Sequence, residues 1–127
     1  GVRIDHQEAD RVEVRFESNR EGSDCPADLC MTVYRICQES LTNVTRHAQA
    51  AKADVQLFVR GGELTLEVSD NGRGLKAEDL AKPSHFGVVG MRERARGHGG
   101  TLDVSGVEGL GTTVMLAVPF AEESAPA

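Results

Sequence analysis

Alternating apolar and polar positions mark the first element of this chain. Val12, Val14 and Phe16 alternate with charged residues, which predicts a strand. A polar loop containing glycine follows over 18–24, and Pro26 suits the first turn of a helix. The pattern therefore predicts a strand that leads through a loop into a helix.

The most regular pattern in the chain is helical. Residues 27–48 contain neither glycine nor proline, and apolar side chains recur there at steps of three and four residues. The repeating positions are Leu29, Val33, Ile36, Cys37, Leu41, Val44 and Ala48. We expect one long helix over 27–48 with a single apolar stripe packed on a core.

Alternation returns twice more and predicts two hairpins. The first joins 55–59 to 64–68 through a tight Gly61-Gly62 turn. The second joins 102–104 to 114–118 through a glycine-containing turn at 106–111, and a short helix over 90–96 precedes it. Helices and antiparallel strands in this order predict an α+β fold: a two-layer α/β sandwich with helices on one face of the sheet.

Composition narrows the classes of function. The chain has 127 residues, 39% of them hydrophobic and 27% charged, which is the make-up of one globular domain. Its net charge of −6 argues against a nucleic-acid partner, which normally needs a basic face. The longest uncharged run, 109–121, is shorter than the roughly 20 residues that span a bilayer, so we expect no direct membrane contact.

The three cysteines, Cys25, Cys30 and Cys37, match no common zinc spacing. We interpret them as free thiols in a reducing compartment, with Cys30 and Cys37 packed in the core.

Candidate chemistry appears first on the flank of the long helix. Glu39, Asn43 and Arg46 lie one turn apart beside the apolar stripe, and His47 follows Asn43 by four residues. Carboxylate and amide oxygens suit Mg²⁺, and a cation suits phosphate. The alternative is an ordinary solvated helix flank.

Three glycine segments follow. Asp70, at a strand end, begins the segment D-N-G-R-G, where a carboxylate can accept a hydrogen bond from an exocyclic amine. The segment G-V-V-G-M over 87–91 opens the short helix, whose backbone amides can bind phosphate. The third segment, G-L-G-T, covers 109–112. Each of the three taken alone also fits an ordinary turn.

Together and in this order, the segments resemble the GHKL ATP-binding superfamily of gyrase-type topoisomerases, heat-shock chaperones, histidine kinases and mismatch-repair ATPases. The matching segments are E-S-L-T-N-V-T-R-H-A, D-N-G-R-G, F-G-V-V-G-M-R-E-R-A and G-L-G-T-T-V, which together cover about 26–119. The resemblance implies the Bergerat fold, whose mixed and mostly antiparallel sheet carries helices on one face. It divides the chain into a linker remnant (1–10), an ATP-binding catalytic domain (11–120) and a flexible tail (121–127).

Within this superfamily, the chain resembles the nitrate-sensor type of bacterial histidine kinase. This similarity lies in Y-R-I-C-Q-E-S-L-T-N-V-T-R-H-A, in G-V-V-G-M-R-E-R-A, and in the short lid of only 75–86 between Gly74 and Gly87. The implied reaction is transfer of the γ-phosphoryl of Mg·ATP to a histidine.

The resemblance assigns roles residue by residue. Asn43 would coordinate Mg²⁺, and Glu39 would act as a base or as a second metal ligand. Arg46 or His47 would approach the phosphates, and Asp70 would accept a hydrogen bond from the adenine amino group. The other implied nucleotide contacts are Gly72, Gly74, Gly87, Val89, Gly90, Met91, Gly109, Gly111 and Thr112.

No histidine of the chain fits the phospho-acceptor of that family, which lies on a dimerising helical hairpin. The candidates were His6, His47, His85 and His98. The expected partners are therefore ATP, the dimerisation and phospho-acceptor domain of the same kinase, and a response regulator. The domain is expected in the cytoplasm, whether or not the longer protein is anchored in a membrane. The alternatives are an anti-sigma-factor-like serine kinase on the same fold and a non-catalytic nucleotide-binding module.

Overall fold

A computed structural model describes residues 2–5, 12–19, 25–45, 50–74 and 87–120. In chain order the elements are β1 (Val2–Asp5), β2 (Glu13–Ser18), α1 (Ala27–Asn43), β3 (Lys52–Arg60), β4 (Glu63–Asp70), α3 (Val88–Arg96), β5 (Thr101–Val107) and β6 (Gly111–Pro119). The strands form one sheet in the order β1-β2-β3-β4-β6-β5. Only β2 and β3 are parallel, and the other neighbouring strands are antiparallel.

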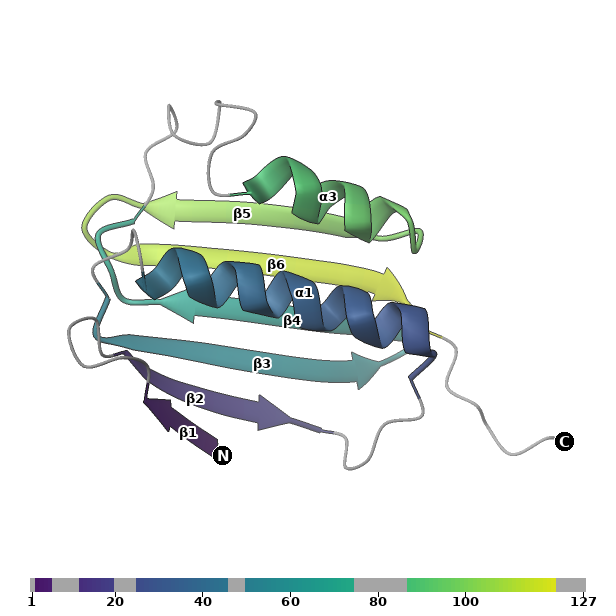
Figure 1. Ribbon diagram of the computed structural model, residues 1–127, viewed down its shortest axis with the longest axis horizontal. Coiled ribbons are helices and arrows are strands. Elements are labelled where there is room, and N and C mark those ends of the chain that lie inside the picture. The colour runs from purple at the N-terminus through teal and green to yellow at the C-terminus, as the bar shows by residue number, and fades with distance from the viewer. Residues whose placement is uncertain (1, 6–11, 20–24, 46–49, 75–86, 121–127) are drawn as a thin grey trace, which may run out of the picture.

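Both helices lie on the same face of the sheet (Figure 1). Helix α1 packs over β4, while α3 packs over β5 and β6. This arrangement confirms the expected two-layer sandwich with a mixed, mostly antiparallel sheet. Neither described helix is both long and apolar enough to cross a membrane.

The core lies between the sheet and the helix layer. Successive side chains of a strand point to opposite faces, so every second residue of the central strands faces the helices. Val55 pairs with Val68, which pairs with Val114, and all three are buried. From the helix layer, Ile36 and Met91 close the core with 0% and 2% of their surface exposed. An aliphatic core of this kind agrees with the low aromatic content of 4%.

Two hydroxyl side chains of α1 are buried although the apolar pattern did not include them. Ser40 Oγ donates to the Ile36 carbonyl at 2.7 Å and contacts Met91 Sδ at 3.7 Å. Thr32 Oγ1 lies 2.9 Å from His98 Nε2. Because these hydroxyl groups have partners in the helix or across the layer, they can be buried at little cost. They bring α3 and the segment that follows it against α1.

The described elements differ from the expected ones at several ends. Helix α1 ends at Asn43 with a single π-type turn at Val44 and Thr45, and 46–49 lie outside the described residues. The second hairpin is tighter than expected, because β5 extends to Val107 and β6 begins at Gly111. Glycines inside that hairpin therefore pair as strand residues, with Val107 opposite Gly111.

The N-terminal segment contributes a strand that the sequence pattern did not predict. Residues 2–5 lie within the expected linker, and in the structure they form β1, the edge strand paired antiparallel with β2. The expected tail, 121–127, lies outside the described residues.

All three cysteines are free thiols, as expected. Cys25 and Cys37 pack against the core, and Cys30 Sγ donates to the Cys25 carbonyl at 3.4 Å. Burial raises the pKa of the Cys37 thiol, which keeps it protonated and unreactive at neutral pH.

Candidate functional site

The sequence motifs converge at one end of the sandwich, on the left in Figure 1. There α1 ends at Asn43, β4 ends at Asp70 and β6 begins at Gly111. Helix α3 begins after Gly87 on the same side of the molecule. Segments far apart in the sequence therefore border one region above the sheet.

Two glycine loops are joined at this end. Gly109 N–H donates to the Arg73 carbonyl at 2.6 Å, which connects the β5–β6 turn to the loop after β4. The space beside the Cα of Gly74 is filled by the backbone of Val107, so a side chain has no room there. The loop after β4 and the β5–β6 turn thus form one continuous wall.

Asn71 anchors this wall from the other side. Its Oδ1 accepts hydrogen bonds from the backbone N–H groups of Ala51 at 3.0 Å and Lys52 at 2.9 Å. The loop after β4 is therefore tied to the start of β3. Sequence reasoning read Asn71 as part of an Asn-Gly turn and missed this positioning role, although a short amide side chain at a strand end was the available signal.

Asp70 presents a partly buried carboxylate on the wall. Its Oδ1 accepts a hydrogen bond from Gly72 N–H at 2.8 Å, and the backbone of Thr112 also bonds to the carboxylate. Burial raises the pKa of Asp70 above its ordinary value, and these two backbone hydrogen bonds oppose the rise. The two backbone donors therefore favour the ionised form of this carboxyl group, while burial disfavours it.

Thr112 adds a buried hydroxyl group beside this acceptor. Its side chain is 9% exposed, and among the described residues its Oγ1 has no hydrogen-bond partner. A buried polar group without a partner costs about 1–3 kcal/mol, so a ligand or a water that bonds to it is favoured. Asp70 and Thr112 together suit a planar ligand edge that both donates and accepts hydrogen bonds.

The opposite side of the region is formed by the end of α1 and the start of α3. Asn43 is half-buried in the last position of α1, and Glu39 is exposed one turn earlier. Gly87 has φ +69°, and a Cβ atom placed on it would come within 2.5 Å of Glu39 Oε1. The carboxylate of Glu39 therefore lies directly against the residue that precedes α3.

Three residues at the start of α3, Val89, Gly90 and Met91, were expected to contact nucleotide, and they differ in exposure. Val89 is 43% exposed and Gly90 is exposed, and both lie in the first turn of α3. Met91 is buried and lies against Ser40, so it acts mainly in packing.

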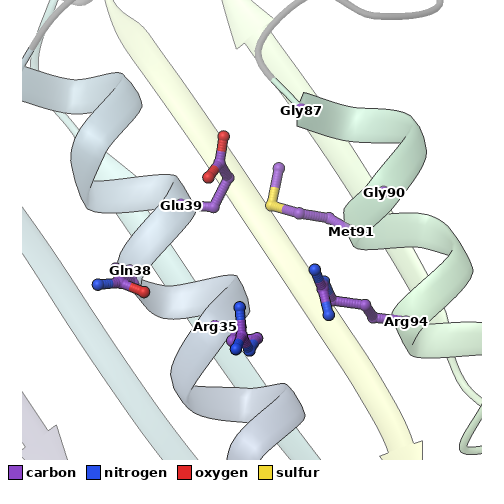
Figure 2. A pocket seen from close by; sticks show the side chains of 7 residues that line it. All are labelled: Arg35, Gln38, Glu39, Gly87, Gly90, Met91 and Arg94. Atoms are coloured by element: carbon purple, nitrogen blue, oxygen red, sulfur yellow. The ribbon is translucent and has the colours of Figure 1, made fainter.

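A cleft of about 250 Å³ runs between the two helices (Figure 2). Its lining comes from both helices and consists of Arg35, Gln38, Glu39, Gly87, Gly90, Met91 and Arg94. Sequence reasoning missed Arg35, Gln38 and Arg94. For Arg35 and Arg94 the available signal was a spacing of four residues, from Glu39 and from Gly90 respectively.

Two expected phosphate contacts, Arg46 and His47, and the lid at 75–86 lie outside the described residues. Among the described residues, Glu39 and Asn43 fit a magnesium ion that is bound partly by the protein and partly by a substrate. Glu39 and Asn43 offer oxygen atoms on adjacent turns, and no cluster of three His, Cys, Asp or Glu residues that would hold a metal occurs in the described parts of the chain. Mg²⁺ is commonly bound through one or two protein oxygens plus phosphates and water, so a dense cluster is unnecessary.

Comparisons with known proteins identify the family of this chain. Residues 28–122 match the family model described as histidine kinase-, DNA gyrase B-, and HSP90-like ATPase. The sensor histidine kinase LiaS of Bacillus subtilis is 46% identical over 92 residues, which are 72% of this chain and 25% of LiaS. The oxygen sensor histidine kinase NreB of Staphylococcus carnosus is 32% identical over 111 residues, which are 87% of this chain and 32% of NreB.

A solved structure of a histidine kinase is also similar to this chain. The blue-light activated histidine kinase of Erythrobacter litoralis EL346 superposes with a TM-score of 0.67 at 27% identity, covering 87% of this chain and 36% of that one. The chain spans a quarter to a third of the length of the two relatives above. With the family model matching most of its length, the chain belongs to the histidine kinase-, DNA gyrase B- and HSP90-like ATPase family.

Proposed function

We propose that this chain is the ATP-binding catalytic domain of a sensor histidine kinase, which transfers the γ-phosphoryl of Mg·ATP to a histidine on a separate dimerisation domain. The observation that carries this proposal is that two polar groups come together at one end of the sheet. The Asp70 carboxylate is bonded by the backbone of Thr112, and the buried hydroxyl group of the same Thr112 has no hydrogen-bond partner among the described residues. A carboxylate can accept from the amino group of adenine, and a hydroxyl group can bond directly or through water to a ring nitrogen. The wall formed by the two glycine loops suits a flat base.

The phosphates would extend from this base toward α1 and α3. The amide oxygen of Asn43 would hold the metal, and the exposed backbone of Gly90 lies at the N-terminus of α3, where N–H groups favour negative charge. Bound Mg²⁺ supplies neutralisation of the phosphate charge. The residues of the chain then contribute mainly positioning and electrostatic stabilisation, which are the main needs of phosphoryl transfer. Glu39, beside Gly87, would orient hydrated metal or accept a proton.

The acceptor would come from outside the described part of this chain. His98 is engaged with Thr32 at the end of α3 opposite to Gly87, and the other three histidines lie outside the described residues. The related proteins named above are sensor histidine kinases, which favours a histidine acceptor over the serine acceptor of the alternative function. We extend the proposal to a phospho-acceptor domain of the same kinase, a downstream response regulator and a location in the cytoplasm, where ATP is available.

Replacement of Asn43 by alanine tests the metal-linked half of this proposal. We expect the wild-type chain to bind ATP more tightly with Mg²⁺ than without it, because the amide oxygen of Asn43 would hold the metal and the metal would offset the negative charge of the phosphates. Asn43→Ala removes that ligand, so affinity in Mg²⁺ should fall about fivefold, while affinity in EDTA should change little. Calorimetric titration with ATP under both conditions measures each value.

The matched control is Gln56→Ala, which removes a side-chain amide from β3, a strand away from the site. It should leave both affinities within about twofold of the wild type. An unchanged effect of Mg²⁺ in Asn43→Ala would refute the assignment of Asn43. A wild-type chain that binds no ATP under either condition would instead favour a module without turnover.

A further inference from the structure

Two arginines from different helices enter the cleft between α1 and α3. Arg35 comes from α1 and Arg94 from α3, and both line the cleft. Figure 2 shows the Arg94 guanidinium group between the two helices and that of Arg35 at the edge of α1 nearest to it. Both residues are exposed, and in the part of the chain that the structure describes neither makes an ion pair. Two cations that share a cleft repel each other unless an anion lies between them.

The only acidic side chain that lines this cleft among the described residues is displaced from the arginines. Glu39 lies against Gly87 at the N-terminal end of α3, whereas Arg94 lies about two turns further along that helix. Figure 2 shows the carboxylate of Glu39 directed toward Gly87 and away from both guanidinium groups. The cleft therefore has an acidic end at the candidate phosphate site and a basic end beyond it.

The size of the cleft selects a side chain as its occupant. Pockets for whole small molecules usually measure about 300–1,000 Å³. A volume of about 250 Å³, open to solvent, suits one or two side chains of a docked segment better than a whole nucleotide. Because the chain carries a net charge of −6, a basic end is a local exception that would select an acidic group.

Exposed apolar residues extend the same surface along α1. Met31 lies one turn before Arg35 and is 53% exposed, and the adjacent Tyr34 is 61% exposed. Exposed large apolar residues beside a charged pair are typical of a contact surface for a protein segment. The surface formed by Met31, Tyr34, Arg35 and Arg94 leads directly to Glu39 and Gly87.

We propose that this surface docks the acceptor-bearing segment of the kinase, and that a carboxylate side chain of that segment lies between Arg35 and Arg94. The inference rests on the proposed function and deepens it. A segment that delivers a histidine to the phosphates must pass over the end of the cleft where Glu39 and Gly87 lie, so its continuation reaches the two arginines. Guanidinium groups bind carboxylates through paired hydrogen bonds, which would fix the segment in one register.

Charge reversal in the full-length kinase tests this docking role. We expect Arg35→Glu and Arg94→Glu each to lower the initial rate of autophosphorylation with radiolabelled Mg·ATP about fivefold, and the double variant at least tenfold. The affinity of each variant for ATP should stay within about twofold of the wild type, because the arginines serve the partner and not the nucleotide. Arg94→Lys should retain more activity than Arg94→Glu, because it keeps the charge.

The matched control is Arg96→Glu, which makes the same charge change on α3 at an exposed position outside the cleft lining. It should leave autophosphorylation within about twofold of the wild type. The docking proposal is overturned if the double variant matches the wild-type rate or Arg96→Glu. It is also overturned if ATP affinity falls in parallel, which would assign the cleft to nucleotide, or if only transfer to the response regulator slows. A wild-type kinase that binds no ATP and does not label would contradict the proposed function itself.

Discussion

Asp70→Asn is expected to lower the affinity of the chain for ATP about thirtyfold. Hydrogen bonds to a charged group contribute about 1.5–3 kcal/mol, and a thirtyfold change corresponds to about 2 kcal/mol. The carboxylate of Asp70 accepts from Gly72 N–H and from the backbone of Thr112. In asparagine one of the two oxygen atoms becomes an NH₂ group, which would then face either a backbone N–H or the amino group of adenine. Calorimetric titration of both proteins with ATP measures the loss.

The same substitution should weaken discrimination between bases. Guanine presents a carbonyl oxygen where adenine presents its amino group, so a carboxylate repels GTP and an asparagine can donate to it. We therefore expect the ratio of ATP affinity to GTP affinity to fall in Asp70→Asn. Asp103→Asn, which makes the same chemical change at an exposed position on β5, should leave this ratio unchanged. Equal ATP affinity in Asp70→Asn and the wild type would exclude Asp70 from the base site.

The pKa of Asp70 makes the stability effect opposite to the binding effect. Because burial raises this pKa, the folded state binds the proton more tightly than the unfolded state, and stability is lost as the pH rises through the folded pKa. The wild type should therefore gain stability from this group as the pH falls through the folded pKa, whereas Asp70→Asn should show no such gain. ATP binding needs the ionised form, so the affinity advantage of the wild type over Asp70→Asn should shrink as the pH falls, beginning above the pH range of an ordinary aspartate. The ratio of the two proteins' ATP affinities at each pH cancels the effect of the titration of ATP itself.

Sequence periodicity predicted the elements well where one face of each is buried. The alternation over 55–59 and 64–68 corresponds to β3 and β4, and the helical stripe from Leu29 corresponds to α1. The same pattern failed to predict the burial of two hydroxyl side chains. Thr32 and Ser40 count as polar in a pattern, yet both are buried because each finds a partner inside the helix layer. Strand β1 was missed because its four residues form an edge that only pairing with β2 reveals.

For the site, the sequence placed Asp70 and Thr112 in one region, and the structure brings them together, but the sequence did not show how the residues there interact. Asp70 and the glycines after it were identified from their order along the chain. The contact between Gly87 and Glu39, and the joining of Arg73 to Gly109, depend on how α3 and the second hairpin return to the sheet. The Arg35–Arg94 pair was invisible for the same reason, since its members come from two helices whose relative position is set by long-range packing.

Gly111 makes the closest backbone contact of the described glycines, and its replacement gives the largest expected loss of stability. Gly111 begins β6 with φ +125°, and its Cα faces the carbonyl group of Asp70 so closely that an added Cβ would overlap that oxygen. Gly111→Ala therefore combines a strained backbone, which costs about 1–3 kcal/mol, with a clash that only movement of the wall can relieve. We expect the free energy of unfolding to fall by about 3 kcal/mol and the melting temperature by about 10 °C.

Gly109→Ala separates these two causes. Gly109 also has a positive φ of 82°, yet nothing lies within 4 Å of the position where its Cβ would stand. Its replacement should cost only the backbone strain, about 1 kcal/mol, and should leave ATP affinity within about threefold of the wild type. Gly111→Ala should also weaken ATP binding, because the clash displaces Asp70 from its bonds to Gly72 and Thr112. Thermal unfolding of both variants measures the difference. Equal losses would show that the wall yields freely and that the position of Asp70 does not depend on its contact with Gly111.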